Sequence, residues 1–230
     1  MSPSLPLFTR LKGRGLRSRR LVVLRRLLLT LAVSIQPVAA ATPASILILG
    51  DSLSSGYGLE QGSGWVALLQ QRLLSETLPD HAVAVTINAS ISGDTTDSGL
   101  KRLPALLRRH QPGITVIELG GNDGLRGFPL AIIENNLATM IKLVRAEGSR
   151  VLLLGMRIPP SYGRRYSEAF HKIYLDLQKQ YQLALVPFLL QGIGGHPKLM
   201  QADGIHPNAL AQAMMLELVW PELNRVLKKQ

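Results

Sequence analysis

Ser52 is the residue of this chain best placed to act as a nucleophile. It lies in the segment Gly50-Asp51-Ser52-Leu53, two residues beyond an apolar run that has the pattern of a buried strand. A serine hydroxyl is a weak nucleophile near neutral pH, and it needs a base within hydrogen-bond reach that is itself oriented by a third group. If Ser52 attacks a substrate, the sequence must therefore also supply a histidine and a carboxylate.

Asp203 and His206 stand three residues apart near the end of the chain, with Gly204 between them. On a loop that bends at Gly204, the carboxylate can accept a hydrogen bond from one imidazole nitrogen while the other nitrogen faces Ser52. An Asp-x-x-His pair alone is equally compatible with a metal site or a helix-capping turn. Its combination with Ser52 favours a catalytic pair.

Two further segments offer hydrogen-bond donors for the oxyanion that forms when a serine attacks an acyl carbon. Gly93 lies in a polar stretch where we expect its backbone N–H at the start of a helix. Asn122 follows Gly120 and Gly121, and we expect its side-chain amide to point into the same space. With the N–H of Ser52, these groups make three donors.

A glycine-rich turn after a strand is also typical of phosphate sites in nucleotide-binding proteins. The spacing of Gly50, Gly56 and Gly58 is not G-x-G-x-x-G, and no lysine follows as in a P-loop. The letters G-D-S-L-S also differ from the G-x-S-x-G elbow of α/β-hydrolases. A nucleotide site and the α/β-hydrolase fold are both disfavoured.

The elements that must position these residues alternate regularly. Short apolar runs predict strands at about 45–49, 82–88, 114–119, 150–154 and 183–186. Helical periodicity predicts helices at about 63–76, 95–110, 130–147, 165–181 and 208–228. We therefore expect an α/β protein, a three-layer α/β/α sandwich with a five-stranded parallel sheet. Ligands of such sheets lie beyond the carboxyl ends of the strands, where the polar segments fall.

Residues 1–41 have the composition of a leader. They contain eight Lys or Arg residues and no acidic residue, and an apolar run at 27–35 precedes small residues at 38–41. A basic region, a short apolar core and an A-x-A type cleavage site predict a secretory signal peptide, which leaves 42–230 as the folded domain of a periplasmic or secreted protein. An uncleaved membrane anchor and a twin-arginine export signal are the alternatives.

The net charge of +11 is concentrated in this leader. Without its eight basic residues the chain has 18 basic residues against 15 acidic ones, so we expect no nucleic-acid partner. The chain has no cysteine, which excludes cysteine nucleophiles and cysteine-based metal sites. At 230 residues and 46% hydrophobic content, it is typical of one globular domain.

Four separated blocks resemble, in order and spacing, those of the SGNH or GDSL hydrolase superfamily: Gly50 to Leu53, Gly93, Gly120 to Asp123, and Asp203 to His206. The resemblance runs from about residue 46 to the C-terminus. Within the superfamily, the stretches NASISGDTT, ELGGNDGLRG, YGRRY and DGIHPN are similar to periplasmic multifunctional acyl-CoA thioesterases that are also described as lysophospholipases and arylesterases.

The resemblance implies a flavodoxin-like SGNH hydrolase fold and a role for each block. It makes Ser52 the nucleophile, His206 the general base and then acid, and Asp203 the residue that orients His206. It makes the Ser52 and Gly93 backbones and the Asn122 side chain the oxyanion hole.

The loop after the fourth expected strand resembles the one that lines the acyl site in such enzymes, which implies that Ile158, Pro159 and Tyr162 contact substrate. Its two prolines, Pro159 and Pro160, make this comparison imperfect. No metal or other cofactor is implied.

The expected function is that of a serine esterase that hydrolyses acyl ester and thioester bonds through an acyl-enzyme. We expect a small-molecule substrate, no stable membrane anchor after signal removal, and a monomer. A carbohydrate O-acetylesterase is the alternative enzyme, because the same triad would serve it. A periplasmic small-ligand binding module on a Rossmann-like sheet is the alternative without catalysis.

Overall fold

The structure is a computed structural model that describes residues 45–75 and 85–228. Its sheet has five strands, all parallel, in the order β2-β1-β3-β4-β5. The strands are β1 (Ile46–Gly50), β2 (Thr86–Asn88), β3 (Ile114–Glu118), β4 (Arg150–Leu154) and β5 (Ala184–Val186). This is the flavodoxin-like order of a doubly wound sheet, so the predicted α/β fold is confirmed.

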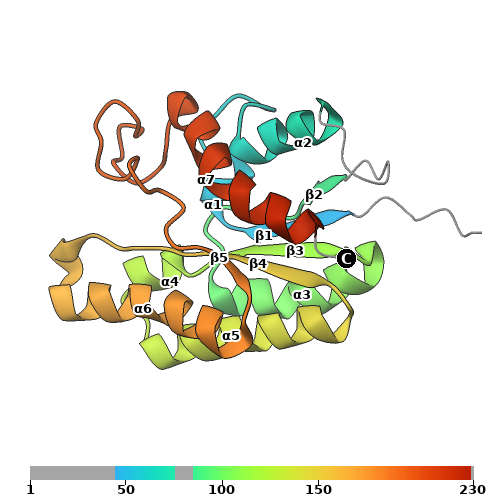
Figure 1. Cartoon of the computed structure of the whole chain (residues 1–230). Coiled ribbons are helices and arrows are strands. Elements are labelled where there is room, and N and C mark those ends of the chain that lie inside the picture. Colours follow the sequence, from blue (N-terminus) through green and yellow to red (C-terminus); the bar gives the residue numbers. More distant parts are fainter. Residues whose placement is uncertain (1–44, 76–84, 229–230) are drawn as a thin grey trace, which may run out of the picture. The chain divides into compact units, whose positions relative to one another are not determined.

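Helices cover both faces of the sheet (Figure 1). One face is covered by α2 (Trp65–Ser75) and α7 (Ala209–Lys228), which pack against each other. The opposite face is covered by α3 (Thr96–His110), α5 (Leu130–Ala146) and α6 (Arg164–Tyr181). Two short helices that periodicity did not predict, α1 (Ser52–Ser55) and α4 (Gly121–Leu125), directly follow β1 and β3, and a 3₁₀ turn, η2 (Pro160–Tyr162), precedes α6.

The central strands β1 and β3 are buried along their whole length, as expected for parallel strands covered on both faces. Their register pairs Ile46 with Ile114 and Gly50 with Glu118, so the two strands end side by side. The segments that follow them, α1 and α4, consequently start next to each other at the carboxyl edge. This register brings the Gly50–Leu53 and Gly120–Asp123 blocks of the sequence together.

Two predictions fall wholly or partly outside the described ranges. The signal peptide predicted at 1–41 lies outside them, and so does the start of the strand predicted at 82–88, of which residues 86–88 are seen as β2. Among residues 45–75 and 85–228, no helix combines the length and the apolar character that a membrane crossing requires.

Candidate active site

Ser52 is the first residue of α1, immediately beyond β1. Asp51 is the N-cap of this helix, and its side chain accepts a hydrogen bond from the Leu53 N–H at 3.0 Å. At the other end of the turn, Gly56 closes the helix in the left-handed conformation, with φ of 79°. The segment Gly50–Gly56, called the nucleophile turn below, therefore presents Ser52 at the carboxyl edge of the sheet.

The structure joins the three predicted triad residues by hydrogen bonds. The His206 Nε2 atom lies 2.9 Å from the Ser52 Oγ, and the His206 Nδ1 atom lies 2.6 Å from the Asp203 Oδ2. A carboxylate can only accept, so Nδ1 carries the proton and Nε2 of the neutral ring is free to accept from the serine hydroxyl. This is the arrangement in which a histidine can remove the proton of Ser52.

The segment Met200–Asn208, called the histidine loop below, is held by its own hydrogen bonds. The Asp203 Oδ1 accepts from the backbone N–H groups of His206 at 3.0 Å and Ile205 at 2.9 Å. The bonds from the His206 backbone, the His206 ring and the Ile205 backbone lower the pKa of Asp203 to about 2. Asp203 is therefore a carboxylate at any pH at which the protein is expected to work.

Two residues that sequence reasoning missed connect the histidine loop to the nucleophile turn. The Tyr57 ring packs against the His206 ring, with centroids 4.5 Å apart. The Gln201 Nε2 donates to the carbonyl groups of Tyr57 at 2.8 Å and Pro207 at 3.1 Å. A side chain at Gly58 would collide with Gln201, because a Cβ there would lie 2.2 Å from its Oε1. No local pattern signals these contacts, which join segments more than 140 residues apart.

Gly93 lies in a turn ahead of α3, which corrects the prediction that it stands at a helix start. The helix begins at Thr96, with Thr95 as its N-cap, and Gly93 has a φ of 84°, a conformation that favours glycine. The turn is fixed against the nucleophile turn by the hydrogen bond from Ile91 N–H to Gly50 O and by the Ser55–Ser92 hydroxyl pair at 2.8 Å.

The Asn122 side chain reaches the same region from α4. Its Nδ2 donates to the Asp51 Oδ2 and to the Asp94 carbonyl, both at 3.0 Å. Both amide hydrogens are thus engaged, and an oxyanion bound here would share one of them. The N–H groups of Ser52 and Gly93 take part in no hydrogen bond within the described ranges, so they are available to a ligand.

Two carboxyl groups are buried here, that of Asp51 within the nucleophile turn and that of Glu118 at the end of β3. Burial is the main cause that raises the pKa of Asp51 to about 6, while a hydrogen bond from Leu53 is the largest opposing cause. Burial and the neighbouring Asp51 raise the pKa of Glu118 well above its usual range. The sequence did not single out Glu118, because it ends an apolar strand and resembles a solvent-facing strand terminus.

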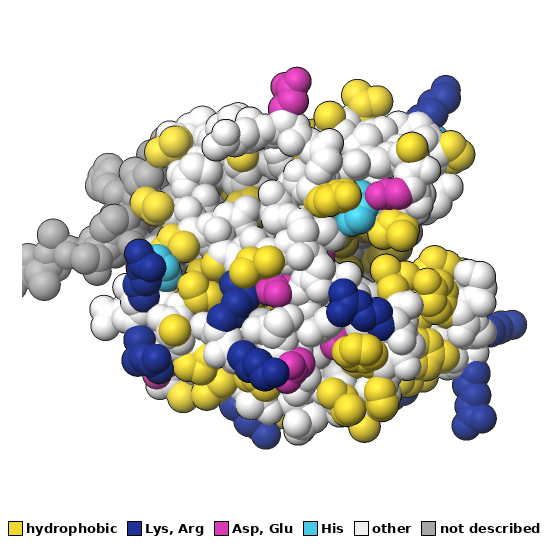
Figure 2. All heavy atoms as spheres, turned by 180° about the vertical axis from the view of Figure 1, so that it is seen from behind, with side chains coloured by type: hydrophobic (Ala, Val, Ile, Leu, Met, Phe, Trp, Pro, Cys, Tyr) yellow, Lys and Arg dark blue, Asp and Glu magenta, His cyan; other side chains and the backbone are white. Residues whose placement is uncertain are grey.

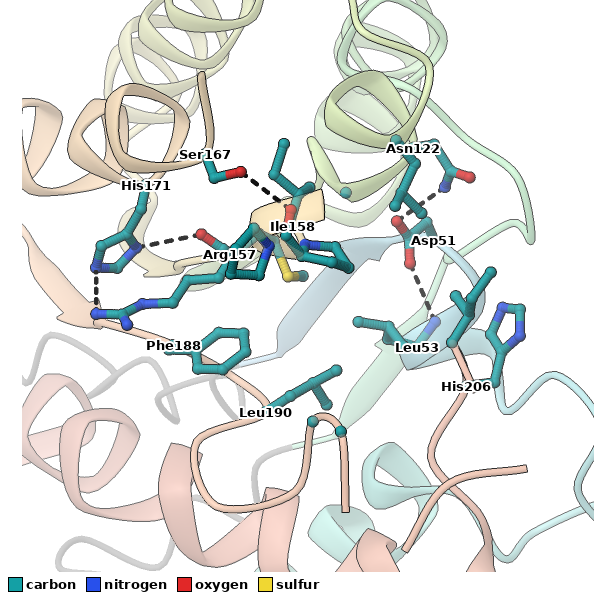
Figure 3. Close-up of a pocket in the computed structure, with 18 of the residues that line it drawn as sticks. Asp51, Leu53, Asn122, Arg157, Ile158, Ser167, His171, Phe188, Leu190 and His206 are labelled. Carbon is teal, nitrogen blue, oxygen red and sulfur yellow. Dashed lines mark hydrogen bonds between the residues drawn. The ribbon is translucent and has the colours of Figure 1, made fainter. Parts of the chain in front are cut away.

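A cavity of about 770 Å³ opens beside these groups. Figure 3 shows Asn122 and His206 at one side of it, Arg157 and His171 at the opposite side, and Ile158, Phe188 and Leu190 between them. The predicted contacts Ile158 and Pro159 line the cavity. Tyr162 does not, because it ends the η2 turn and leaves its side chain half exposed beyond the cavity wall.

The surface view in Figure 2 shows a hollow where hydrophobic side chains gather. Lys and Arg side chains are scattered over this face, with acidic side chains among them, and form no continuous stripe. Across residues 45–75 and 85–228, no group of three or more His, Asp or Glu side chains is arranged to hold a metal ion. The site is therefore built from a serine, a histidine and carboxyl groups beside an apolar cavity.

Comparison with protein families gives a match over residues 48–214 to the GDSL-like Lipase/Acylhydrolase family. Esterase TesA of Pseudomonas aeruginosa is 53% identical over 199 residues, which cover 86% of this chain and 96% of that protein. The thioesterase 1/protease 1/lysophospholipase L1 of Escherichia coli K12 is 45% identical over 184 residues, which cover 80% of this chain and 85% of that protein.

Solved structures agree with these similarities. The psychrotrophic esterase EstA from Pseudoalteromonas sp., determined in a form inhibited by monoethylphosphonate, superposes with a TM-score of 0.74 at 40% identity. The match covers 80% of this chain and 99% of that one. The likeness therefore extends over nearly the whole of a solved esterase.

Proposed function

The chain belongs to the GDSL-like lipase/acylhydrolase family, and from that premise we propose how it cleaves its substrates. It is a serine hydrolase that acts on carboxylic ester and thioester bonds of small molecules. We propose that Ser52 is the nucleophile, His206 the base and Asp203 the residue that orients the base. The observation that carries this proposal is the hydrogen-bonded chain from Ser52 through His206 to Asp203 beside an apolar cavity.

In the first half-reaction, the Ser52 Oγ bonds to the acyl carbon and its proton passes to His206 Nε2. The carbonyl oxygen becomes an oxyanion that the N–H groups of Ser52 and Gly93 and the amide of Asn122 stabilise. When the tetrahedral intermediate collapses, the bond to the alcohol or thiol breaks and the leaving group takes the proton from His206. The product of this step is an acyl ester of Ser52.

In the second half-reaction, His206 removes a proton from water, and the resulting hydroxide attacks the acyl carbon of the ester. A second tetrahedral intermediate forms in the same oxyanion site. Its collapse returns the proton from His206 to the Ser52 Oγ and releases the carboxylic acid. Asp203 remains ionised and keeps the proton on His206 Nδ1 throughout.

The cavity supports acyl chains as the preferred substrates over acetylated sugars. Its wall between the site and Arg157 consists largely of Leu, Ile, Pro, Phe and Met side chains, which offer a carbohydrate few hydrogen bonds. Burying each methylene of an alkyl chain contributes about 0.8 kcal/mol. This wall argues against the carbohydrate O-acetylesterase alternative.

We further propose that the protein works in the periplasm or outside the cell as a monomer, without a nucleic-acid partner and without a stable membrane anchor after its signal is removed. The leader-like composition of residues 1–41 supports export. The mixed charge of the face in Figure 2 supports the absence of a nucleic-acid partner.

The experiment that tests the function is hydrolysis of a series of p-nitrophenyl esters from acetate to palmitate, and of acyl-CoA thioesters, by the mature protein. Ser52→Ala is the control variant. We expect activity that requires Ser52, with a kcat/KM that rises with chain length beyond acetate. Activity on acetate alone would indicate a carbohydrate O-acetylesterase, and no activity together with no labelling by a fluorophosphonate would indicate a binding module.

A further inference from the structure

Glu118 is a fully buried carboxyl group that the reaction described above does not use. It is the last residue of β3, paired in register with Gly50. Its Oε2 accepts hydrogen bonds from the Asp51 N–H at 3.1 Å and from the Ser54 hydroxyl at 2.6 Å. Its Oε1 is buried and has no hydrogen-bond partner among the residues that the structure describes.

Space around Glu118 is closed by the nucleophile turn itself. A Cβ placed on Gly50 would lie 2.6 Å from the Glu118 Oε2 and 2.8 Å from the Ser54 Cβ. The glycine of the Gly50-Asp51-Ser52 motif thus allows the carboxyl group to pack directly under the turn that carries Ser52. No other residue type fits at position 50 while Glu118 and Ser54 stay in place.

Glu118 is connected to the oxyanion site through Asp51. The Asp51 backbone N–H donates to the Glu118 Oε2 at 3.1 Å, so the buried carboxyl group holds the residue that caps α1. The Asp51 Oδ2 then accepts from Asn122. The path therefore runs from Glu118 through Asp51 to the amide of Asn122.

Burial and hydrogen bonding indicate which of the two carboxyl groups is protonated. Both oxygens of the Asp51 carboxyl group accept hydrogen bonds, from the Leu53 N–H and from the Asn122 amide, as expected for a carboxylate. Tyr174, which packs from α6, is buried, and its hydroxyl donates to the Leu119 carbonyl. Glu118 is fully buried and its Oε1 receives no hydrogen bond from any described residue, and burial raises its pKa well above the usual range, so Glu118 is the neutral acid and Asp51 the carboxylate.

We infer that Glu118 is a positioning residue that acts as a neutral carboxylic acid, holding Asp51, and through it Asn122 and the Ser52 turn, without adding a second buried negative charge where the oxyanion forms. This inference rests on the proposed function. An ionised Glu118 would place like charges next to each other and oppose the oxyanion, whereas the protonated group still accepts hydrogen bonds from the turn through Oε2.

Two substitutions test this role. Glu118→Gln keeps the shape and the carbonyl acceptor for the Asp51 N–H and the Ser54 hydroxyl, but it cannot be ionised. Glu118→Leu removes the acceptor. We expect Glu118→Leu to lower kcat by about 100-fold with little change in KM, as for the loss of one oxyanion donor, and Glu118→Gln to restore kcat to within about tenfold of the parent.

A matched control separates this effect from a general loss of packing in β3. Thr115 is equally buried in the same strand, and its hydroxyl pairs with Ser149 at 2.9 Å, at the end of the strand away from the site. Thr115→Val should lower the melting temperature and leave kcat unchanged. If Thr115→Val and Glu118→Leu lower kcat equally, Glu118 is only a structural residue.

A double-mutant cycle tests the path to the oxyanion site. If Glu118 acts through Asn122, the losses in kcat from Glu118→Leu and Asn122→Ala are not additive, and the double variant is about as active as Asn122→Ala alone. Additive losses overturn the inference. If Glu118→Leu does not fold, Glu118→Gln decides: a loss of kcat beyond about 100-fold shows that the ionised form is needed. A parent protein without esterase activity, or a Ser52→Ala variant with full activity, would instead contradict the proposed function.

Discussion

The nucleophile turn and the histidine loop meet at the hydrogen bond between Ser52 and His206, but they lie in very different surroundings. At the nucleophile turn, the side chains of Asp51 and of the adjacent Glu118 are buried. In the histidine loop, the Asp203 side chain is 39% exposed and the His206 side chain 18% exposed. The two regions belong to one site, yet one is part of the core and the other is part of the surface.

This difference changes how each region controls its carboxyl groups. Burial raises the pKa of Asp51 and Glu118, and the surrounding hydrogen bonds only partly oppose it. At Asp203, three hydrogen bonds within the loop lower the pKa and burial counts for little. A serine site can therefore obtain its ionised carboxylate from a short loop, while the core holds the neutral acid.

The largest loss of kcat should follow from removing the imidazole of His206, which joins the histidine loop to the nucleophile turn. We expect His206→Ala to lower kcat by a factor on the order of 10⁵, because no base is then left beside Ser52 to take its proton. Steady-state hydrolysis of a p-nitrophenyl ester measures it, with His196→Ala as the matched control at an exposed histidine. Equal losses in the two variants would contradict the assignment of His206.

Removing the carboxylate of Asp203, in the exposed histidine loop, should cause the next largest loss of kcat. We expect Asp203→Asn to lower kcat by roughly 10³- to 10⁴-fold with little change in KM, because the amide favours the wrong tautomer of His206. The measurement is kcat and KM over a range of ester chain lengths. A loss of less than tenfold would show that the loop geometry positions His206 without the carboxylate.

A smaller effect is expected from loosening the contact between the regions. Gly58 and Gly62 both have positive φ, but only at Gly58 would a Cβ meet Gln201, which binds the Tyr57 and Pro207 carbonyls. We expect Gly58→Ala and Gly62→Ala each to lower the free energy of unfolding by roughly 1–2 kcal/mol. Only Gly58→Ala should also lower kcat, by about tenfold. Denaturant unfolding and ester hydrolysis measure the two quantities, and a similar fall in kcat for both variants would exclude a role for Gln201.

The smallest expected effect concerns how stability depends on pH. The contributions of Asp51 and Asp203 should change in opposite directions as the pH rises. The pKa of Asp51 is raised from 3.8 to about 6, so its contribution to stability is present below pH 3.8 and is lost as the pH rises through about 6. The pKa of Asp203 is lowered to about 2, so its contribution is present above pH 3.8 and is lost as the pH falls through about 2.

Melting temperatures across this pH range, compared with the parent, test the signs. The difference between Asp51→Asn and the parent should become more positive by a few degrees as the pH rises from 3.8 to beyond 6. The difference between Asp203→Asn and the parent should become more negative as the pH rises from about 2 to 3.8. Slopes of the same sign would show that burial does not distinguish the two carboxyl groups.

The sequence predicted the sheet well because its strands carry their own signal. β1 is an apolar run that ends in Gly50, and β3 is mostly apolar and is followed by Leu119 and two glycines, so both the strands and the location of the site could be inferred. The short helices α1 and α4 were not predicted, because four or five residues do not show a helical period. The helix predicted at 95–110 begins within one residue of α3, but Gly93 was expected at its start, whereas Thr95 is the residue that caps the helix.

Contacts between segments that are distant in the chain could not be predicted from the sequence alone. Glu118 becomes an internal residue only once β3 is paired with β1, and Gln201 acquires its role only once it reaches Tyr57. Tyr162 was expected at the acyl site because the loop after β4 resembles the loop that lines the acyl site in SGNH hydrolases. The η2 turn, which begins at Pro160, instead carries Tyr162 beyond the cavity wall.

The apolar cavity also bears on what happens after the chemistry is complete. Hydrolysis alters the carboxyl end of an acyl group and leaves its hydrocarbon unchanged, so the wall formed by Ile158, Phe188 and Leu190 holds a fatty acid product as well as it holds the substrate. At about 0.8 kcal/mol per methylene, each pair of added carbons slows departure by roughly tenfold. With lengthening chains, turnover therefore becomes limited by product release, and a rapid initial burst should precede a slower steady rate.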